Sequence, residues 1–174
     1  NDCIAIGHNA LTAQNTNSSN NVAIGYAAAS TLNGGTDSVY LGYYAGGVGA
    51  ITGDYNTCVG TNAAKNMTTA TGCTFIGMDA GGLGVVGGTS NEGRYNTVVG
   101  YAAGYDLTVG ENNCLMGVSA GANLTDNDDN VVVGQGALST AKDGEHYNIA
   151  IGTKALLTEN SGAGGCVAIG YNAL

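Results

Sequence analysis

A short apolar segment that ends in glycine recurs ten times along the 174-residue chain. Ile4-Ala5-Ile6-Gly7 and Val131-Val132-Val133-Gly134 are two of the copies. The residue directly before the glycine is always a large aliphatic, and the residue two before it is apolar in every copy. The glycines recur with a nearly constant spacing, and the one clearly longer interval runs from Gly77 to Gly100. The ten repeat glycines are Gly7, Gly25, Gly42, Gly60, Gly77, Gly100, Gly117, Gly134, Gly152 and Gly170.

Each apolar segment predicts a short strand, because side chains alternate between the two faces of extended backbone. The residues one and three before the glycine share one face, and the residue between them lies on the other. A strand that is apolar on both faces is buried on both. One face therefore points into the interior of its own coil, and the other requires a second apolar surface. This pattern predicts a single all-β domain, residues 1–174, folded as a β-solenoid of ten coils with a period of about 17–18.

The rest of each coil is polar and rich in glycine, and we expect it to form an outer strand and turns with only scattered apolar contacts. Those scattered residues are Leu32, Met67, Leu107 and Leu124. At roughly 4.8 Å per coil, ten coils predict a rod about 50 Å long.

Three positions of the repeat carry a specific physical demand. The glycine permits a positive φ or a close approach of two backbones. Asparagine stands four residues before the glycine in six copies, where stacked amides predict a partial side-chain ladder. An alanine follows three residues after every glycine and marks a place where a larger side chain does not fit: Ala10, Ala28, Ala45, Ala63, Ala80, Ala103, Ala120, Ala137, Ala155 and Ala173.

The strings Asn21-Val-Ala-Ile-Gly-Tyr-Ala-Ala28 and Cys166-Val-Ala-Ile-Gly-Tyr-Asn-Ala173 resemble the head repeat of trimeric autotransporter adhesins of the YadA type. Similar arrays are found in phage tail-fibre and other virion-fibre proteins. The resemblance covers all ten units. It implies a left-handed parallel β-roll and a homotrimer whose Val-Ala-Ile-Gly strands line a threefold axis. The period is longer than in the adhesin head, which favours the phage or virion fibre.

Charge excludes several classes of partner. The formal net charge is −9, with only four basic residues, Lys65, Arg94, Lys142 and Lys154. Such a surface repels nucleic acid and anionic membranes. No apolar run approaches the length of about 20 residues that a membrane span needs. Because the chain begins with Asn1, we expect it to be a segment of a longer fibrous protein.

An acyltransferase built on the left-handed hexapeptide helix is the main enzymatic alternative, because its coil has nearly the same length. Ile6-Gly7-His8-Asn9-Ala10-Leu11 fits its hexapeptide pattern. That pattern occurs once per turn here, whereas a triangular coil requires three. His8 and His146 lie in unrelated units and are expected to be exposed turn residues. The sequence predicts no catalytic residues and no cofactor.

Two further groups of residues are candidates for binding chemistry. The turn at Asp126, Asp128 and Asp129 is a weak calcium candidate, against the simpler interpretation of a solvated acidic turn. Five cysteines occur without a C-x-x-C motif and are expected to be buried free thiols: Cys3, Cys58, Cys73, Cys114 and Cys166.

The long interval and the tyrosines indicate where recognition takes place. The interval from Gly77 to Gly100 predicts an enlarged loop at 81–95, and loops on a rigid scaffold commonly carry recognition. Glu92, Arg94 and Tyr95 are the candidate receptor contacts there. Several of the ten tyrosines stand directly after the repeat glycine or before the asparagine. They either bind sugars or protein partners, or pack at the corners of the coils.

The sequence therefore predicts a structural and adhesive fibre segment that projects a recognition surface for a glycan or protein receptor on a host cell or other surface. We expect it to be extracellular, on a virion fibre or a bacterial surface. The alternatives are a bacterial trimeric adhesin head, a subunit of a self-assembling extracellular filament, and the hexapeptide-type acyltransferase. An ice-binding solenoid is disfavoured, because no Thr-x-Thr array repeats at one position.

Overall fold

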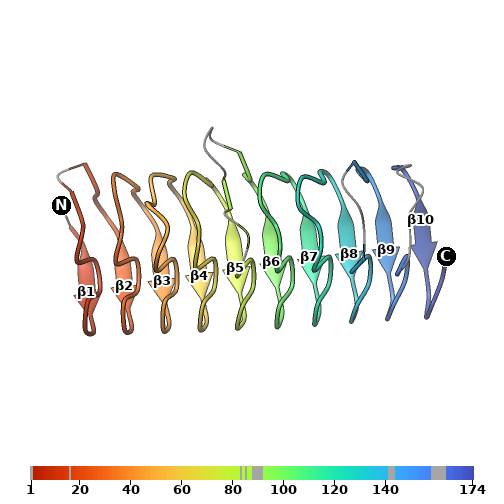
Figure 1. Ribbon diagram of the computed structural model, residues 1–174, viewed down its shortest axis with the longest axis horizontal. Helices are drawn as coiled ribbons and strands as arrows, with labels where there is room; N and C mark the ends of the chain where they lie inside the picture. Colours follow the sequence, from red (N-terminus) through yellow and green to blue (C-terminus); the bar gives the residue numbers. More distant parts are fainter. Residues whose placement is uncertain are drawn as a thin grey trace.

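The chain forms a β-solenoid in which ten short strands stand side by side along a rod, with the two termini at opposite ends (Figure 1). This computed structural model describes residues 2–15, 17–82, 84, 86–87, 92–140, 144–157 and 164–174. The strands are β1 (Ile4–Ile6), β2 (Val22–Ile24), β3 (Val39–Leu41), β4 (Thr57–Val59), β5 (Thr74–Ile76), β6 (Thr97–Val99), β7 (Cys114–Met116), β8 (Val131–Val133), β9 (Ile149–Ile151) and β10 (Val167–Ile169).

The ten strands form one parallel sheet in sequence order, and equivalent residues of the repeat pair with each other throughout. Ala5 pairs with Ala23 between β1 and β2, for example, and Val98 pairs with Leu115 between β6 and β7. The long interval between β5 and β6 does not disturb this register, because Phe75 of β5 still pairs with Val98 of β6. The all-β solenoid predicted from the repeat is confirmed.

The expected outer strand is not formed in the described part of the chain. The one β-type pairing outside the ten strands is an isolated parallel bridge between Leu32 and Ile51. The remaining described residues form turns and bends whose backbone groups bond to the next coil, as in the bond from the Asn33 amide to the Ile51 carbonyl at 2.7 Å. In the described residues, the glycine-rich connection between successive strands therefore completes each coil through turns and does not form a second sheet.

The interior of the coil is filled from three sides. The middle residue of each strand points inward and is buried in β2 to β10, with Tyr40 and Phe75 the largest. The repeat alanines from Ala28 to Ala155 are fully buried beside them. Leu32, Met67, Leu107 and Leu124 are also completely buried. The expectation that these four make only scattered contacts is wrong, because all four belong to one buried core.

The repeat glycine is required both by its positive φ and by the close approach of the next coil. Its φ lies between +128° and +140° in all ten copies. In the first nine, a Cβ atom would lie only 2.4 to 2.8 Å from the carbonyl oxygen of the glycine one coil further on. Any side chain would therefore push two coils apart at the corner where the strand ends.

Candidate functional site

The outward surface of the sheet is mostly apolar and is partly to largely exposed to solvent. We define the outer sheet face as the side chains one and three residues before the repeat glycine and one residue after it. Ile6, Leu41 and Met116 on this face are 57%, 42% and 46% exposed, although they are large aliphatic side chains. The face carries no Asp, Glu, Lys or Arg over all ten coils. It is the second apolar surface that the strand pattern required, and the described part of a single chain leaves it uncovered.

Tyrosines form part of this face and also border it. Tyr26, Tyr43, Tyr101 and Tyr171 follow the repeat glycine and are 42% to 74% exposed. Tyr55, Tyr95 and Tyr147 stand five residues before it and are 58% to 67% exposed. The latter three also have φ between 58° and 61°, in the left-handed region. Other coils carry Asn, Asp or Gly at this position. These seven tyrosines therefore stay at the surface, where Tyr26 and Tyr43 stack on each other, whereas Tyr40, the middle residue of β3, is fully buried in the core.

A continuous polar ladder runs inside the solenoid, four residues before the repeat glycine. The backbone amide of each ladder residue donates to the side chain of the ladder residue one coil earlier. Asn113 donates to Oδ1 of Asn96 at 2.9 Å, and Asn130 donates to Oδ1 of Asn113 at 3.0 Å. Ser38, Cys3, Cys73 and Cys166 occupy the other four coils, so that the ladder is complete: the Asn56 amide donates to Ser38 Oγ at 2.9 Å.

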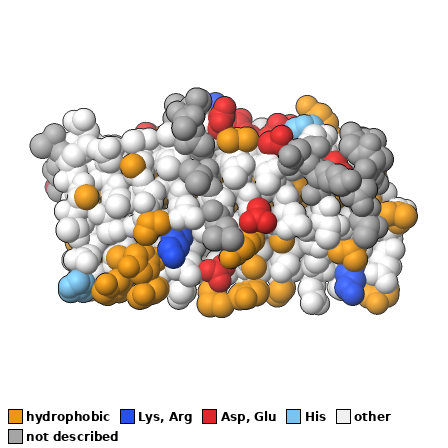
Figure 2. Space-filling view, viewed as in Figure 1, with side chains coloured by type: hydrophobic (Ala, Val, Ile, Leu, Met, Phe, Trp, Pro, Cys, Tyr) orange, Lys and Arg blue, Asp and Glu red, His pale blue; other side chains and the backbone are white. Residues whose placement is uncertain are grey.

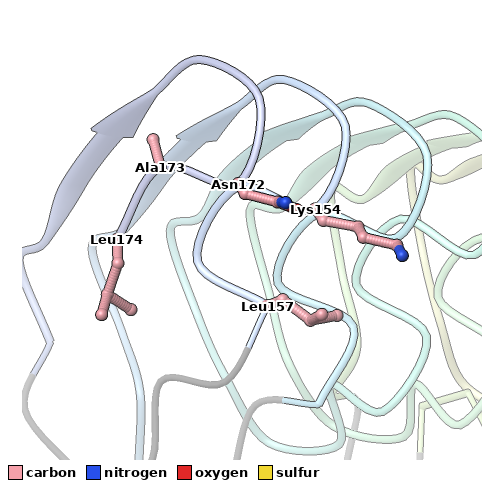
Figure 3. Close-up of a pocket in the computed structure, with 5 residues that line it drawn as sticks. All are labelled: Lys154, Leu157, Asn172, Ala173 and Leu174. Carbon is pink, nitrogen blue, oxygen red and sulfur yellow. The ribbon is translucent and has the colours of Figure 1, made fainter.

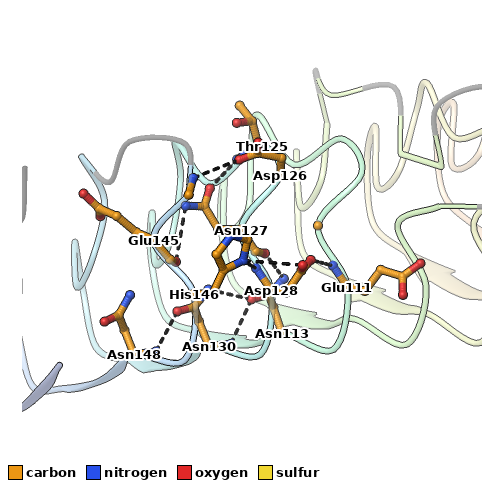
Figure 4. Close-up of polar contacts among 12 residues, drawn as sticks. Glu111, Asn113, Thr125, Asp126, Asn127, Asp128, Asn130, Glu145, His146 and Asn148 are labelled. Atoms are coloured by element: carbon orange, nitrogen blue, oxygen red, sulfur yellow. Dashed lines mark hydrogen bonds and ion pairs between the residues drawn. The ribbon is translucent and has the colours of Figure 1, made fainter. Parts of the chain in front are cut away.

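A second ladder, six residues before the repeat glycine, runs in the opposite direction. The Glu111 amide donates to Oδ1 of Asp128 at 2.7 Å, and the Asp128 amide donates to Nδ1 of His146 at 2.9 Å (Figure 4). Nδ1 of His146 also lies 3.4 Å from Oδ2 of Asp128. Because Nδ1 accepts a hydrogen bond, it carries no proton, and we treat this contact as part of the ladder and not as an ion pair.

The ladders account for the acidic turn that was a calcium candidate. Asp128 accepts from the Glu111 amide, and Oδ1 of Asp126 accepts from the Gly144 amide at 3.4 Å. Asp129 takes a corner conformation with φ 56°. Among the described residues, no three His, Cys, Asp or Glu side chains converge as metal ligands would. The carboxylates of Asp126 and Asp128 thus accept hydrogen bonds from neighbouring coils.

The candidate receptor contacts lie beside β6. Arg94 pairs with Glu111 of the next coil through Nε at 3.1 Å, and both side chains are partly exposed. Tyr95 is 58% exposed, whereas Glu92 is half-buried. Residues 83, 85 and 88–91 of the expected loop at 81–95 lie outside the described residues.

The five cysteines differ in environment, and all are free thiols. Cys58 is the inward residue of β4, and Cys73 belongs to the inner ladder; both are buried. Burial raises the pKa of the Cys58 thiol and raises that of Cys73 to about 11. Cys3, Cys114 and Cys166 are partly exposed, so the expectation that all five are buried is wrong. Cys114 lies on the outer sheet face, three residues before Gly117.

The two histidines are far apart in the rod and have different partners. His8, in the first coil, stacks on Tyr26 with ring centroids 5.3 Å apart, whereas His146 belongs to the second ladder in the ninth. A hollow of about 340 Å³ at the C-terminal end is lined by Lys154, Leu157, Asn172, Ala173 and Leu174 (Figure 3). Lys154 is the one ionisable side chain of that lining.

Comparison with protein-family models, with curated proteins and with solved structures finds no match for this chain. The described residues contain no helix that is long and apolar enough to cross a membrane.

Proposed function

We propose that this chain is a structural and adhesive fibre segment in which three copies pack their outer sheet faces around a threefold axis. The rod then projects its remaining surfaces for attachment to a host cell or another surface. A phage or virion tail fibre is the favoured setting, with the head of a bacterial trimeric adhesin as the alternative. Both settings are extracellular.

The outer sheet face is the observation that carries this proposal. Ten strands at a spacing of about 4.8 Å and three side-chain columns about 7 Å apart give a patch of roughly 600 Å². That is the upper end of the largest apolar patch on a typical soluble monomer, about 300–600 Å². Continuous patches of this size mark interaction sites. Because every coil contributes to it, its partner must follow the whole rod, and a second and third copy of the same rod do so.

The threefold arrangement and the left-handed coil follow from the resemblance to adhesin heads and tail fibres. A dimer with two sheet faces in contact would cover the same side chains, so the native mass decides between them. Light scattering coupled to size exclusion should give roughly three times 17.1 kDa at micromolar concentration. A monomer of normal secondary structure at that concentration would contradict the proposal.

A charge on the outer sheet face tests whether that face is the contact. Ile76 lies in β5, at the middle of the rod, and is 39% exposed. Ile76→Asp would place like charges at the axis and should reduce the native mass to about one chain, because a buried unpaired carboxylate is costly. Ala50→Asp adds the same charge at an exposed position away from this face and should leave the mass of the wild type unchanged.

A further inference from the structure

A groove of about 400 Å³ crosses the first three coils on the side of the rod next to the outer sheet face. We propose that this groove binds a neutral saccharide. The inference rests on the proposed attachment function and assigns it a site and a class of ligand. Figure 2 shows hydrophobic side chains gathered most densely along the lower edge of the N-terminal third, next to a histidine and a basic side chain.

The groove arises from unequal side chains at one position of the repeat. Two residues after the repeat glycine, the first three coils carry Asn9, Ala27 and Tyr44. All three have φ between 53° and 60°, so the backbone is the same and only the side chain changes. The small Ala27 forms a gap between an amide on one side and an aromatic ring on the other. With coils about 4.8 Å apart, the coils that carry the two walls are roughly 10 Å apart.

The aromatic wall is held in place by its neighbours. The Tyr44 ring meets Tyr26 and Tyr43 edge-on, with ring centroids 5.6 and 4.7 Å apart. Nζ of Lys65 lies 5.3 Å from the centroid of Tyr44. At Gly47, a Cβ atom would come within 2.7 Å of Cδ1 of Tyr44, so the absence of a side chain there makes room for the ring. A ring fixed in advance loses little entropy when a sugar stacks on it.

Hydroxyl groups beside Tyr44 are oriented by the backbone of the next coil. The Ser30 hydroxyl donates to the carbonyl of Gly47, and the Thr31 hydroxyl donates to the carbonyl of Gly49. Each hydroxyl has therefore used its proton and presents its oxygen as an acceptor. Saccharide hydroxyls can donate to these oxygens, while the Asn9 amide offers both a donor and an acceptor.

The lining selects the class of ligand. It contains one phenol ring, one amide and three aliphatic hydroxyl groups, and none of its residues is charged. A sugar has an apolar face of C–H groups and a polar rim of hydroxyls, which matches this combination. The nearby cation, Lys65, lies over the Tyr44 ring and is not itself a lining residue, and an anionic ligand would meet a chain of net charge −9. A neutral saccharide therefore fits better than a charged one.

The groove remains open in the proposed trimer. Its lining residues stand two, five and six residues after the repeat glycine, whereas the outer sheet face ends one residue after it. Saccharide binding and trimer formation therefore depend on different side chains and can fail independently.

Saturation-transfer NMR on the full chain tests the proposal, with cellobiose, lactose, maltose and chitobiose as neutral probes and sialyllactose as the anionic one. Tyr44→Asn removes the aromatic wall, and Ala27→Asn fills the gap. Coils 4 and 10 carry Asn62 and Asn172 at this position, so the fold accepts both changes. Tyr105→Asn, in a coil beyond the groove, is the control. We expect at least one neutral probe to bind, and each groove variant to bind it about tenfold more weakly or not at all.

The outcomes separate the two proposals. Binding that is lost in Tyr44→Asn and Ala27→Asn but kept in Tyr105→Asn supports the groove, and it does so whether the native mass is that of a trimer or of a monomer. No transfer to any neutral probe at 10 mM, roughly the weakest useful affinity, overturns it. Binding that both groove variants retain, or binding of sialyllactose alone, overturns it as well. If the protein is a trimer but binds no neutral probe, the proposed fibre function stands and the proposed saccharide site is refuted.

Discussion

The backbone amide of Asn96 donates to the sulfur of Cys73 at 3.5 Å, at a step of the inner ladder where most coils use an amide oxygen. Sulfur is a weak acceptor. Cys73→Asn would restore the oxygen, and its amide could donate to the Gly93 carbonyl, which Cys73 Sγ contacts at 3.1 Å. We expect this variant to melt at or above the wild-type temperature and Cys73→Ala to lose about 1–2 kcal/mol. Equal melting temperatures for Cys73→Ala and the wild type would contradict this role.

Asn113 should be among the most sensitive residues of the ladder. Its Oδ1 accepts from the amide and the side chain of Asn130, and its Nδ2 donates to the Asn127 carbonyl at 2.7 Å. Asn113→Ala leaves these buried groups without partners and should cost about 2–4 kcal/mol in urea unfolding. The exposed neighbour provides the control: Asn112→Gly keeps φ at 57°, where Gly72 and Gly165 stand in other coils, and should cost less than about 1 kcal/mol.

Gly100 tests the close approach of successive coils. A Cβ atom there would lie 2.4 Å from the Gly117 carbonyl oxygen. We expect Gly100→Ala to lower the free energy of unfolding by about 4 kcal/mol or more, or to prevent folding. Gly136→Ala also changes a glycine with positive φ, but its Cβ would meet nothing closer than 3.8 Å, and Ala27 and Ala102 occupy the same position. Similar losses for both variants would contradict a special steric demand at Gly100.

Cys114 reports on the proposed interface directly. It lies on the outer sheet face and is partly exposed in one chain, whereas Cys58 and Cys73 are buried within the coil. In a protein with Cys3 and Cys166 changed to Ser, a maleimide at pH 7.5 should label Cys114 rapidly at dilution and slowly at concentrations that favour the trimer. Cys58 and Cys73 should stay unlabelled until the chain unfolds. Labelling of Cys114 that does not depend on concentration would argue against burial of this face.

The buried thiols should weaken the fold at alkaline pH. The pKa of Cys73 rises from about 9.0 to about 11 on folding because of burial, and that of Cys58 rises as well. Their contribution is complete below pH 9 and is lost as pH rises through 11, because only the unfolded state can release the protons. Urea unfolding at pH 7.5 and 10.5 should show a loss of about 4 kcal/mol more for the wild type than for a Cys58→Ala, Cys73→Asn variant, about 2 kcal/mol for each thiol. Alanine is tolerated at the first site, as in Ala23 and Ala150. Equal losses would exclude the thiols as the cause.

The repeat predicted much of this structure because its signals are local and identical in every coil. The roles of the repeat glycine, the repeat alanine and the strand that is apolar on both faces could be predicted because the same residue types recur at the same positions in ten coils. The ladder was predicted only in part, because Cys73 and Ser38 accept the same hydrogen bond as asparagine while sharing little of its chemistry. The core role of Leu107 was missed although Leu32, Met67 and Leu124 stand at the same position of the repeat, because other coils carry Gln14, Gly49 and Gly84 there. The groove depends on Ala27 being smaller than Asn9 and Tyr44 at the same position of the neighbouring coils. This difference is lost when the ten coils are reduced to one consensus repeat.

The undisturbed register between Phe75 and Val98 has a practical consequence. Here the connection is longer than elsewhere, yet the strands on either side pair as all the others do. The connection between two strands can therefore change in length, while the strand, the repeat glycine and the inner ladder fix how successive coils stack. Mutation in nature can lengthen, shorten or exchange these connections one at a time and keep the same scaffold. The same tolerance makes this interval a natural place to graft a foreign peptide for display.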